Sequence, residues 1–415
     1  MQPVDLPGVS ILPRAVAPLL ETALRTMRVV VVTGPRQAGK STLVRSHPKL
    51  ASRPYCSLDD SATLLRAQAD RRAFVRSVPE MIIDEVQRDP ALILAIKVIV
   101  DEQHPPRRGQ FVLTGSANLL MMSHVGDSLA GRAYYLRLQP LTRKEQQGLG
   151  TTGSWTRFFE TPVEDWLEMV RSGTHSREDW REAAKRGGFP AAAVEIRDPE
   201  ERSLWFDGYV ATYLERDLRD LKAVSDLPSF RALMQAAALR IGNLLNHAEL
   251  ARDVKMPAST VHSYLGLLET TFQATRLPPY ARNRTKRLIK TPKLYWNDVG
   301  LALHLAGGEP TGAHLENYIL TDLLAWRDTE IPRPEITYWR TAAGAEVDFV
   351  IERKRKLLAV EVKSSGAPSP RDAANLTTFQ SEYGATVCGG LILHGGEETY
   401  WLGEKILAVP WWYVM

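Results

Sequence analysis

The chain has 415 residues, of which 44% are hydrophobic, and a formal net charge of +4 at pH 7. This length predicts two to four domains, and the small net charge excludes a polycation, so any affinity for nucleic acid must come from a local patch. Cys56 and Cys388 lie far apart, which argues against a disulfide framework and a structural zinc site. With no signal-peptide pattern and no apolar run near the ~20 residues of a membrane span, we expect a cytoplasmic protein that does not bind membranes.

The segment from Gly34 to Ser41 reads Gly-Pro-Arg-Gln-Ala-Gly-Lys-Ser, which fits the phosphate-binding pattern G-x-x-x-x-G-K-[ST] at every fixed position. A β-branched run predicts a buried parallel strand over 28–33, and an apolar-periodic helix begins after the loop. Lys40 is expected to reach the β and γ oxygens of ATP, and the Ser41 hydroxyl to hold Mg²⁺. The predicted nucleotide-binding residues are Gly34, Pro35, Arg36, Gln37, Ala38, Gly39, Lys40, Ser41 and Thr42.

Residues 80–88 form a second apolar strand that ends in the adjacent acids Asp84 and Glu85. Beside a phosphate loop, Asp84 is expected to hold Mg²⁺ through its water shell, and Glu85 to orient or deprotonate the attacking water. The pair therefore predicts hydrolysis of ATP, and not binding alone.

A third strand, over 110–114, leads into the polar residues Ser116 and Asn118 at the carboxyl edge of the expected parallel sheet. Contact with the γ-phosphate and capping of a turn or helix explain these two residues equally well. Arg132 precedes a fourth strand, over 133–138. It either stabilises γ-phosphate charge, in cis or across a subunit boundary, or is an ordinary surface arginine.

These motifs, with the Leu-Ala-Gly-Arg turn at 129–132, resemble the prokaryotic AAA-type ATPases of the archaeal-ATPase-like branch. The resemblance extends over nearly the whole chain, because residues 213–217, 290–295, 297–301 and 346–349 match as well. It implies an AAA-type core able to form homo-oligomers and a C-terminal region of poorly known function. It does not supply a substrate.

A short helix over 248–254, a tight connection and a second helix from Ala258 or Ser259 predict a helix-turn-helix. Its second helix leaves Ser259, Thr260 and His262 free where a recognition helix meets base edges. Residues 270–297 contain seven basic residues and no acid, a charge suited to phosphate contact by a β wing. A protein-contact or structural module is the alternative. The candidate wing contacts are Arg282, Arg284, Lys286 and Arg287.

The order of a helix over 315–326, a strand with Asp348 and a strand with Glu361 and Lys363 resembles the PD-(D/E)XK nuclease fold. The resemblance implies that Asp348 and Glu361 hold a second divalent metal, that Lys363 positions or activates water, and that Glu316 supports them. Glu361 and Lys363 share one face of a strand because they are two residues apart. Val347 stands where the family's usual proline would precede the aspartate. A degenerate fold that keeps the acids as an ion pair or binding surface is the alternative.

The sequence thus predicts an α/β protein with four parts: a P-loop NTPase core with a parallel sheet over 1–150, a helical lid or connector over 151–230, a winged helix over 231–300, and a restriction-endonuclease-like domain over 301–415. The leading hypothesis is an ATPase that couples its nucleotide state to nucleic-acid engagement, DNA being favoured, with metal-dependent nuclease activity as a nested hypothesis. The competing hypothesis is an ATP-dependent switch that binds a protein partner and has an inactive C-terminal domain.

Overall fold

The computed structural model describes residues 11–116, 129–173, 175–213, 224, 226–281 and 291–415. The chain forms two compact units, each with its own sheet. The first comprises the residues up to Leu141 with 147–151 and 270–272, and the second comprises 142–146, 152–269 and 273–415. No helix in these described ranges is long and apolar enough to cross a bilayer.

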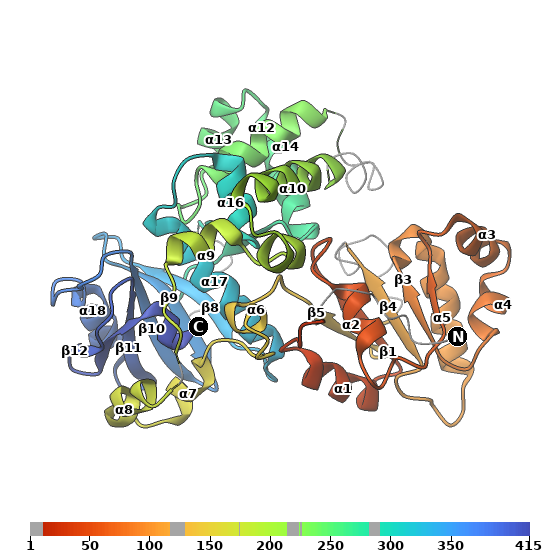
Figure 1. The fold of residues 1–415 in the computed structure, drawn as a ribbon, viewed down its shortest axis with the longest axis horizontal. Coiled ribbons are helices and arrows are strands. Elements are labelled where there is room, and N and C mark those ends of the chain that lie inside the picture. Colours follow the sequence, from red (N-terminus) through yellow and green to blue (C-terminus); the bar gives the residue numbers. More distant parts are fainter. Residues whose placement is uncertain (1–10, 117–128, 174, 214–223, 225, 282–290) are drawn as a thin grey trace. The chain divides into compact units, whose positions relative to one another are not determined.

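The first unit is a parallel five-stranded sheet in the order β2-β3-β4-β1-β5 (Figure 1). The elements are α1 (Ala17–Thr26), β1 (Val29–Thr33), α2 (Lys40–Ser46), β2 (Tyr55–Ser57), α3 (Ser61–Ala69), α4 (Arg71–Arg76), β3 (Met81–Asp84), a 3₁₀ turn (Val86–Arg88), α5 (Pro90–Glu102), β4 (Phe111–Gly115) and β5 (Ala133–Arg137). The four predicted strands are present, and the edge strand β2 is an addition that the sequence did not reveal.

Helices cover both faces of this sheet, which explains why the first four residues of β1 are all valine. Val29 and Val31 pack with residues of α4 and α5, whereas Val30 and Val32 pack with residues of α1 and α2 on the opposite face. Side chains alternate between the two faces of a strand, so a strand buried on both faces is apolar at most of its positions. The phosphate loop follows this buried strand directly.

The second unit begins with helices and includes a helix-turn-helix followed by a β hairpin. Its first elements are α6 (Arg143–Gln146), α7 (Trp155–Glu160), a 3₁₀ turn (Val163–Asp165), α8 (Trp166–Arg171), α9 (Trp180–Arg186), a π turn (Ala191–Glu195), α10 (Pro199–Thr212), α12 (Leu227–Ala238), α13 (His247–Asp253) and α14 (Ala258–Thr270). The strands β6 (Ala274–Leu277) and β7 (Lys293–Trp296) then pair antiparallel. This is the order of elements that the sequence predicted for a winged helix.

The C-terminal part of the second unit is a six-stranded mixed sheet in the order β12-β13-β11-β10-β9-β8. Its elements are α16 (Val299–Ala306), α17 (Gly312–Thr329), β8 (Glu335–Arg340), β9 (Glu346–Arg353), β10 (Lys356–Lys363), α18 (Ala374–Tyr383), a 3₁₀ turn (Gly384–Thr386), β11 (Val387–His394), β12 (Tyr400–Gly403), β13 (Ile406–Pro410) and α19 (Trp411–Val414). Residues of α17 pack in one core cluster with one face of β9 and β10, and residues of α18 pack in another with the opposite face. The helix and the two acid-bearing strands therefore follow in the predicted order.

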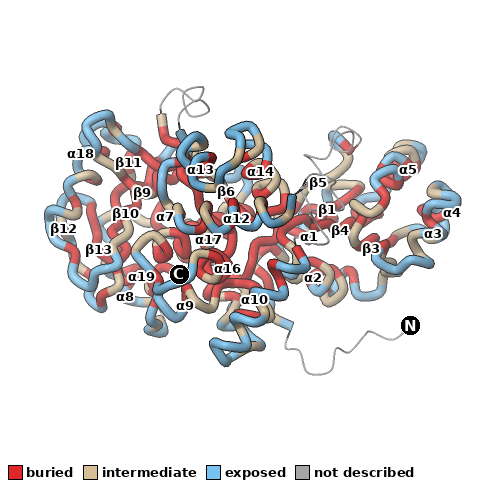
Figure 2. Tube along the Cα trace, turned by 90° about the horizontal axis from the view of Figure 1, so that it is seen from above, coloured by how far each residue is buried: buried red, intermediate tan, exposed pale blue. Residues whose placement is uncertain are grey.

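One continuous core joins the helical segments, the hairpin and the C-terminal sheet of the second unit. It includes Phe230 of α12, Leu265 of α14, Tyr295 of β7, Ile319 of α17 and Phe349 of β9. Figure 2 shows α16 and α17 as largely buried segments. The structure groups these residues more coarsely than the four predicted domains, whose boundaries stay a prediction.

Candidate functional site

The phosphate loop has a backbone that only certain residues can adopt. Gly34 and Gly39 have φ values of 150° and 93°, and Gln37 also has a positive φ, 61°. A Cβ added to Gly34 would lie 2.1 Å from the carbonyl oxygen of Leu138, so a side chain cannot fit there. The nine predicted nucleotide-binding residues lie together in this loop and in the first turn of α2. The loop is therefore shaped to present main-chain N–H groups, as phosphate binding requires.

Arg14 holds the phosphate loop through hydrogen bonds to main-chain carbonyls, a role that the sequence did not reveal. Its guanidinium is buried and donates to the carbonyl oxygens of Ala38, at 2.8 Å, and Gln139, at 2.6 Å. One bond holds the loop and the other holds the segment after β5. The loop conformation is thus supported before any ligand binds.

Lys40 folds back over its own loop. Its Nζ donates to the carbonyl oxygens of Gly34, at 3.1 Å, and Pro35, at 2.8 Å, and the residue is only 5% exposed. The ammonium therefore lies inside the loop that receives the phosphates. Phosphate oxygens would replace these carbonyl acceptors.

Asp84, at the end of β3, accepts hydrogen bonds from three hydroxyl groups. Ser41 Oγ lies 2.9 Å from its Oδ1, Tyr55 donates to its Oδ2 at 2.6 Å, and Thr114 donates to its Oδ1. Burial and the bond to Asp84 raise the pKa of Tyr55 above its ordinary value, so Tyr55 stays a donor. The structure thus brings together Ser41 and Asp84, the two residues predicted to hold Mg²⁺.

Glu85 and Ser116 meet beside Asp84. Glu85 has a left-handed backbone, with φ 56°, and its N–H donates to Thr114 Oγ1 at 3.3 Å. Gln87 Nε2 donates to the Glu85 carboxylate and, at 3.1 Å, to Ser116 Oγ. Because β4 lies between β1 and β3, the end of β4 necessarily stands beside both motifs. Asn118, the other candidate, lies outside the described residues.

Arg132 is not brought to this site. Its carbonyl oxygen accepts from the N–H of Val29, the first residue of β1, whereas the phosphate loop follows the last residue of that strand. Five residues at ~3.3 Å each separate the two ends by roughly 16 Å. The guanidinium of Arg132 instead pairs with Asp101, at 2.5 and 2.8 Å. The expected role in cis is therefore corrected, because Arg132 lies at the amino-terminal ends of the parallel strands and the phosphate loop lies at their carboxyl ends. The role across a subunit boundary stays a prediction.

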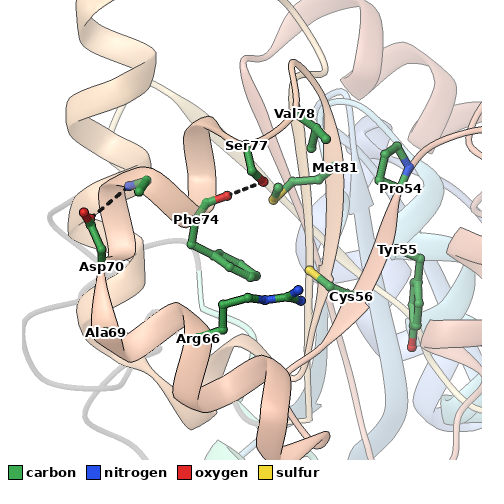
Figure 3. A pocket seen from close by; sticks show the side chains of 11 residues that line it. Pro54, Tyr55, Cys56, Arg66, Ala69, Asp70, Phe74, Ser77, Val78 and Met81 are labelled. Carbon is green, nitrogen blue, oxygen red and sulfur yellow. Dashed lines mark hydrogen bonds between the residues drawn. The ribbon is translucent and has the colours of Figure 1, made fainter.

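A cavity of about 490 Å³ lies against the edge strand β2 and helices α3 and α4 (Figure 3). Cys56 and Arg66 point into it, and Phe74 and Met81 contribute apolar walls (Figure 3). Burial raises the pKa of the Cys56 thiol to about 11, which leaves it unreactive at neutral pH. No residue of the phosphate loop lines this cavity.

The helix-turn-helix presents part of its predicted contact surface. Ser259 and His262 are exposed on the first turns of α14, and Thr260 is half-buried. Arg282, Arg284, Lys286 and Arg287 lie outside the described residues. Two further members of the basic run are not available to phosphates as expected: Arg276 pairs with Glu269, and Lys293 is buried. The expectation that the basic run serves phosphate contact is therefore corrected for Arg276 and Lys293.

Lys293 lies among the acids that the nuclease resemblance singled out. We define the carboxylate cluster as Glu316 of α17, Glu346 and Asp348 of β9, and Glu361 of β10. The Nζ of Lys293 is 3.2 Å from Glu316 Oε1, 2.6 Å from Glu346 Oε1 and 3.7 Å from Asp348 Oδ1.

The remaining contacts of the cluster come from its own strands and from β7. Tyr295 donates to Glu316, the N–H of Val362 donates to Asp348 Oδ2 at 2.8 Å, and Lys363 donates to Glu361 Oε1 at 2.8 Å. The predicted residues Glu316, Asp348, Glu361 and Lys363 are thus gathered at one place.

Burial and mutual repulsion weaken the acids Glu316, Asp348 and Glu361. Burial, and then the charge of Asp348, raise the pKa of Glu316 to about 7 and that of Glu361 to about 8. Burial also raises the pKa of Asp348. Although burial alone would lower the pKa of Lys293, the Glu316 and Asp348 carboxylates raise it above its ordinary value. The lysine is therefore a cation at neutral pH, and two of the acids around it, Glu316 and Asp348, have raised pKa values.

Comparison with known proteins identifies the family. Residues 26–146 match the AAA domain, residues 177–312 match a domain of unknown function (DUF8612) and residues 311–414 match another (DUF4143). Over 408 aligned residues the chain is 30% identical to the uncharacterized protein Rv2008c of Mycobacterium tuberculosis. The alignment covers 96% of this chain and 83% of that protein. The chain belongs to this AAA-domain family. The same identity and coverage hold for the uncharacterized protein Mb2031c of Mycobacterium bovis.

Solved structures similar to this AAA-family ATPase include the Walker-type ATPase of Pyrococcus abyssi, with a TM-score of 0.42 and 15% identity over 71% of this chain and 99% of that chain. The replication initiator DnaA bound to AMPPCP and single-stranded DNA has a TM-score of 0.30 and 16% identity over 63% of this chain and 89% of that chain. A RuvB of Thermotoga maritima has a TM-score of 0.30 and 20% identity over the same shares. The family assignment rests on the sequence matches.

The core of this AAA-family ATPase fits the Mg²⁺ that accompanies ATP. The donors that meet at the end of β3 are a serine hydroxyl and a carboxylate, and Mg²⁺ prefers oxygen ligands from one or two such side chains, with phosphates and water completing its shell. Asp84 already accepts three hydroxyl donors, which shows that the carboxylate is held in place.

The second divalent metal expected at Asp348 and Glu361 does not fit the cluster as it is arranged. Within the described ranges, no group of three histidine, cysteine, aspartate or glutamate side chains is placed to hold a metal ion. The ammonium of Lys293 lies among the acids instead. The metal expectation is therefore corrected: in this arrangement the cation of the cluster is a lysine.

Several residues of both sites escaped sequence reasoning. Arg14, Tyr55 and Thr114 support the nucleotide site, and Lys293 and Glu346 complete the carboxylate cluster. A signal was present for Thr114, since it ends a strand that runs to the carboxyl edge of the sheet. Arg14 and Tyr55 lie in no motif. Lys293 and Glu346 lie in segments that resemble the family, but the resemblance gave them no role, which comes from contacts across long stretches of sequence.

Proposed function

We propose that the protein hydrolyses ATP at the phosphate loop and that its nucleotide state controls the engagement of nucleic acid, DNA in the first place, by the helix-turn-helix and its hairpin. The observation that carries the proposal is the hydrogen bond of 2.9 Å between Ser41 and Asp84. It joins the two motifs that nucleotide hydrolysis requires, although 43 positions separate them in the sequence.

In hydrolysis, each residue of the core has a distinct task. Bound Mg²⁺ supplies positive charge at the phosphates, where negative charge develops. Ser41 and Asp84 would hold the ion, and the Lys40 ammonium would exchange the carbonyls of Gly34 and Pro35 for phosphate oxygens. Glu85 orients the attacking water and accepts its proton. Ser116, which shares Gln87 with Glu85, would contact the γ-phosphate.

The nucleic-acid part of the proposal rests on α14 and on the basic hairpin. Ser259 and His262 expose polar groups at the N-terminal end of α14, the part of a recognition helix that reaches base edges. The hairpin sequence adds Arg282, Arg284, Lys286 and Arg287, which suit phosphate contact. We do not propose phosphodiester cleavage for this chain, because Lys293 occupies the acids that would hold the metal.

Assembly into a homo-oligomer completes the proposal. Arg132 lies at the sheet edge opposite to its own phosphate loop, so only a neighbouring subunit could receive it at a γ-phosphate. Its ion pair with Asp101 would have to open for that contact. An arginine supplied in trans contributes about 10³-fold or more to phosphoryl transfer in other NTPases.

The first test is steady-state ATP turnover with Mg²⁺, with and without DNA, at low and moderate salt. We expect turnover that DNA stimulates, with a stimulation that fades as salt rises because phosphate contacts release counterions. Lys40→Ala should abolish turnover, and normal activity of that variant would refute the assignment of the site. Turnover that ignores DNA would favour the switch that binds a protein partner.

A matched pair of serine variants tests the DNA surface. Ser263 on α14 and Ser381 on α18 are both exposed, and each hydroxyl donates to the carbonyl oxygen four residues earlier, at 3.1 and 2.9 Å. Ser263→Glu places a negative charge on the proposed contact face and should weaken DNA binding about tenfold, whereas Ser381→Glu should leave it unchanged. Equal binding by both variants would count against contact through α14.

A further inference from the structure

The carboxylate cluster contains a cation supplied by the chain itself. We infer that Lys293 and a divalent metal ion compete for the same acids, so that the cluster becomes a metal site only when the Lys293 ammonium is absent from it. The nucleotide site takes no part in this inference, which holds whether or not the proposed function is correct.

The first support is the position of the ammonium. Lys293 is only 3% exposed, and its Nζ faces carboxylates from α17 and β9 at 3.2, 2.6 and 3.7 Å. An ammonium group has three N–H donors and no acceptor, so it satisfies acids in the same way as a small metal ion. Removing one member of such a buried arrangement leaves the other charges uncompensated.

The second support is an oxygen atom that the arrangement leaves unused. Glu361 is 5% exposed, and its Oε2 has no hydrogen-bond partner among the described residues, although Lys363 satisfies its Oε1. A buried carboxylate oxygen without a partner is unfavourable unless a ligand fills the place. Asp348 Oδ2 is taken by the N–H of Val362, but its Oδ1 has Lys293 as a neighbour at 3.7 Å. Glu361 thus offers a second acid oxygen to a cation, beside the Asp348 oxygen that Lys293 faces, and a bound metal ion would displace any proton on Glu361.

The third support is the exclusion of a second cation. A divalent ion held by Asp348 would lie close to the Lys293 ammonium, which is 3.7 Å from Asp348 Oδ1. The positive charges of the ion and of the Lys293 ammonium would repel each other strongly, because water screens charges little in a buried site. The ion and the ammonium therefore cannot occupy the cluster together.

Lys293 is held at the cluster by its strand. The N–H of Gly242 donates to Leu294 O at 2.8 Å, and Trp296 exchanges two bonds of 2.8 Å with the side chain of Asn317 on α17. On the other side of the lysine, the N–H of Leu245 donates to Pro292 O at 2.8 Å, so the chain is bonded both before and after Lys293. The ammonium consequently occupies the acids in the resting protein.

The test is calorimetric titration of the nucleotide-free full chain with Mn²⁺. All proteins carry Asp84→Asn, so that the core does not contribute a binding site. We expect no binding by this parent protein at millimolar Mn²⁺, and binding of one ion, tighter by about 100-fold or more, when Lys293→Met is added. Adding Glu361→Gln to that variant should remove the ion. Equal Mn²⁺ affinity of the parent and the Lys293→Met protein would overturn the inference.

Lys363→Met is the matched control. It also removes an ammonium that bonds to Glu361, but it leaves Lys293 among the acids, so it should not create a metal site. Near-ultraviolet circular dichroism, with its strong tryptophan signal, shows whether each variant keeps its fold. If Lys293→Met does not fold, the parent decides the question alone: Mn²⁺ binding by the parent that Asp348→Asn abolishes would overturn the inference, and its absence would support it.

Discussion

Replacing Glu361 by glutamine should remove a pH-dependent loss of stability from the second unit. Burial raises the pKa of Glu361 from 4.5 to about 8. The unfolded chain therefore releases this proton near pH 4.5, while the folded chain keeps it until about pH 8. Folding incurs no penalty from this group below the lower pKa, and stability declines as the pH rises through the window between the two values.

The size of the effect follows from the width of that window. At about 1.4 kcal/mol per pKa unit, ionising Glu361 in the folded protein costs on the order of 5 kcal/mol, most of it between about pH 5 and about pH 8.5. For a unit of this size the corresponding change in melting temperature is roughly 10 °C. We expect Glu361→Gln to melt close to the wild type near pH 5 and well above it near pH 8.5.

Differential scanning calorimetry measures this difference. The transition of the second unit is the one that Mg²⁺ and ATP do not shift, because a ligand stabilises the unit that binds it. Glu404→Gln is the control, since Glu404 is exposed in the turn between β12 and β13 and should follow the wild type. Parallel melting curves of the wild type and Glu361→Gln across the whole pH range would refute the reasoning.

Three further predictions concern the nucleotide site. Glu85→Gln should keep ATP binding within about twofold and lower turnover by about 100-fold or more, measured by fluorescent-nucleotide titration and phosphate release; a parallel loss of binding would contradict its assignment as base. Tyr55→Phe should lower the unfolding free energy of the nucleotide-free core by about 1.5 kcal/mol in urea, because it deletes a donor to the Asp84 carboxylate, and an unchanged midpoint would count against that bond. Gly34→Ala should weaken ATP binding at least tenfold, because its Cβ meets Leu138 O at 2.1 Å, and wild-type affinity would show that the loop adapts.

The nucleotide site could be predicted because its signals are local. A run of four valines, a glycine loop and a lysine-serine pair stand next to one another, and each constrains the backbone or the charge within a few residues. The strand that ends at Asp84 has the same local character. Tyr55 gave no such signal, because its bond to Asp84 spans 29 positions and depends on the edge strand β2 pairing with β3.

Arg132 and Lys293 show why local patterns failed elsewhere. Arg132 stands beside a conspicuous turn, but the parallel direction of β5 places it at the amino edge of the sheet. Lys293 lies in a window without acids, so a local count assigned it to phosphate contact. Its acidic partners follow 23 to 55 positions later, on α17 and β9. Only the folding of β7 onto α17 turns this surface charge into a buried one.

The position of Lys293 also bears on how the hairpin and the cluster act on each other. Coupling between two sites needs an element with two arrangements that both sites influence. Both sites can influence strand β7, because it belongs to the hairpin and carries the Lys293 ammonium of the cluster. Its residue Trp296 also donates to and accepts from the side chain of Asn317. Moving it would open those bonds and break a buried ion pair, at a cost of about 3 to 5 kcal/mol. A nucleic acid must therefore bind the displaced arrangement more tightly by that amount before it can expose the acids, and weaker ligands leave the lysine in place.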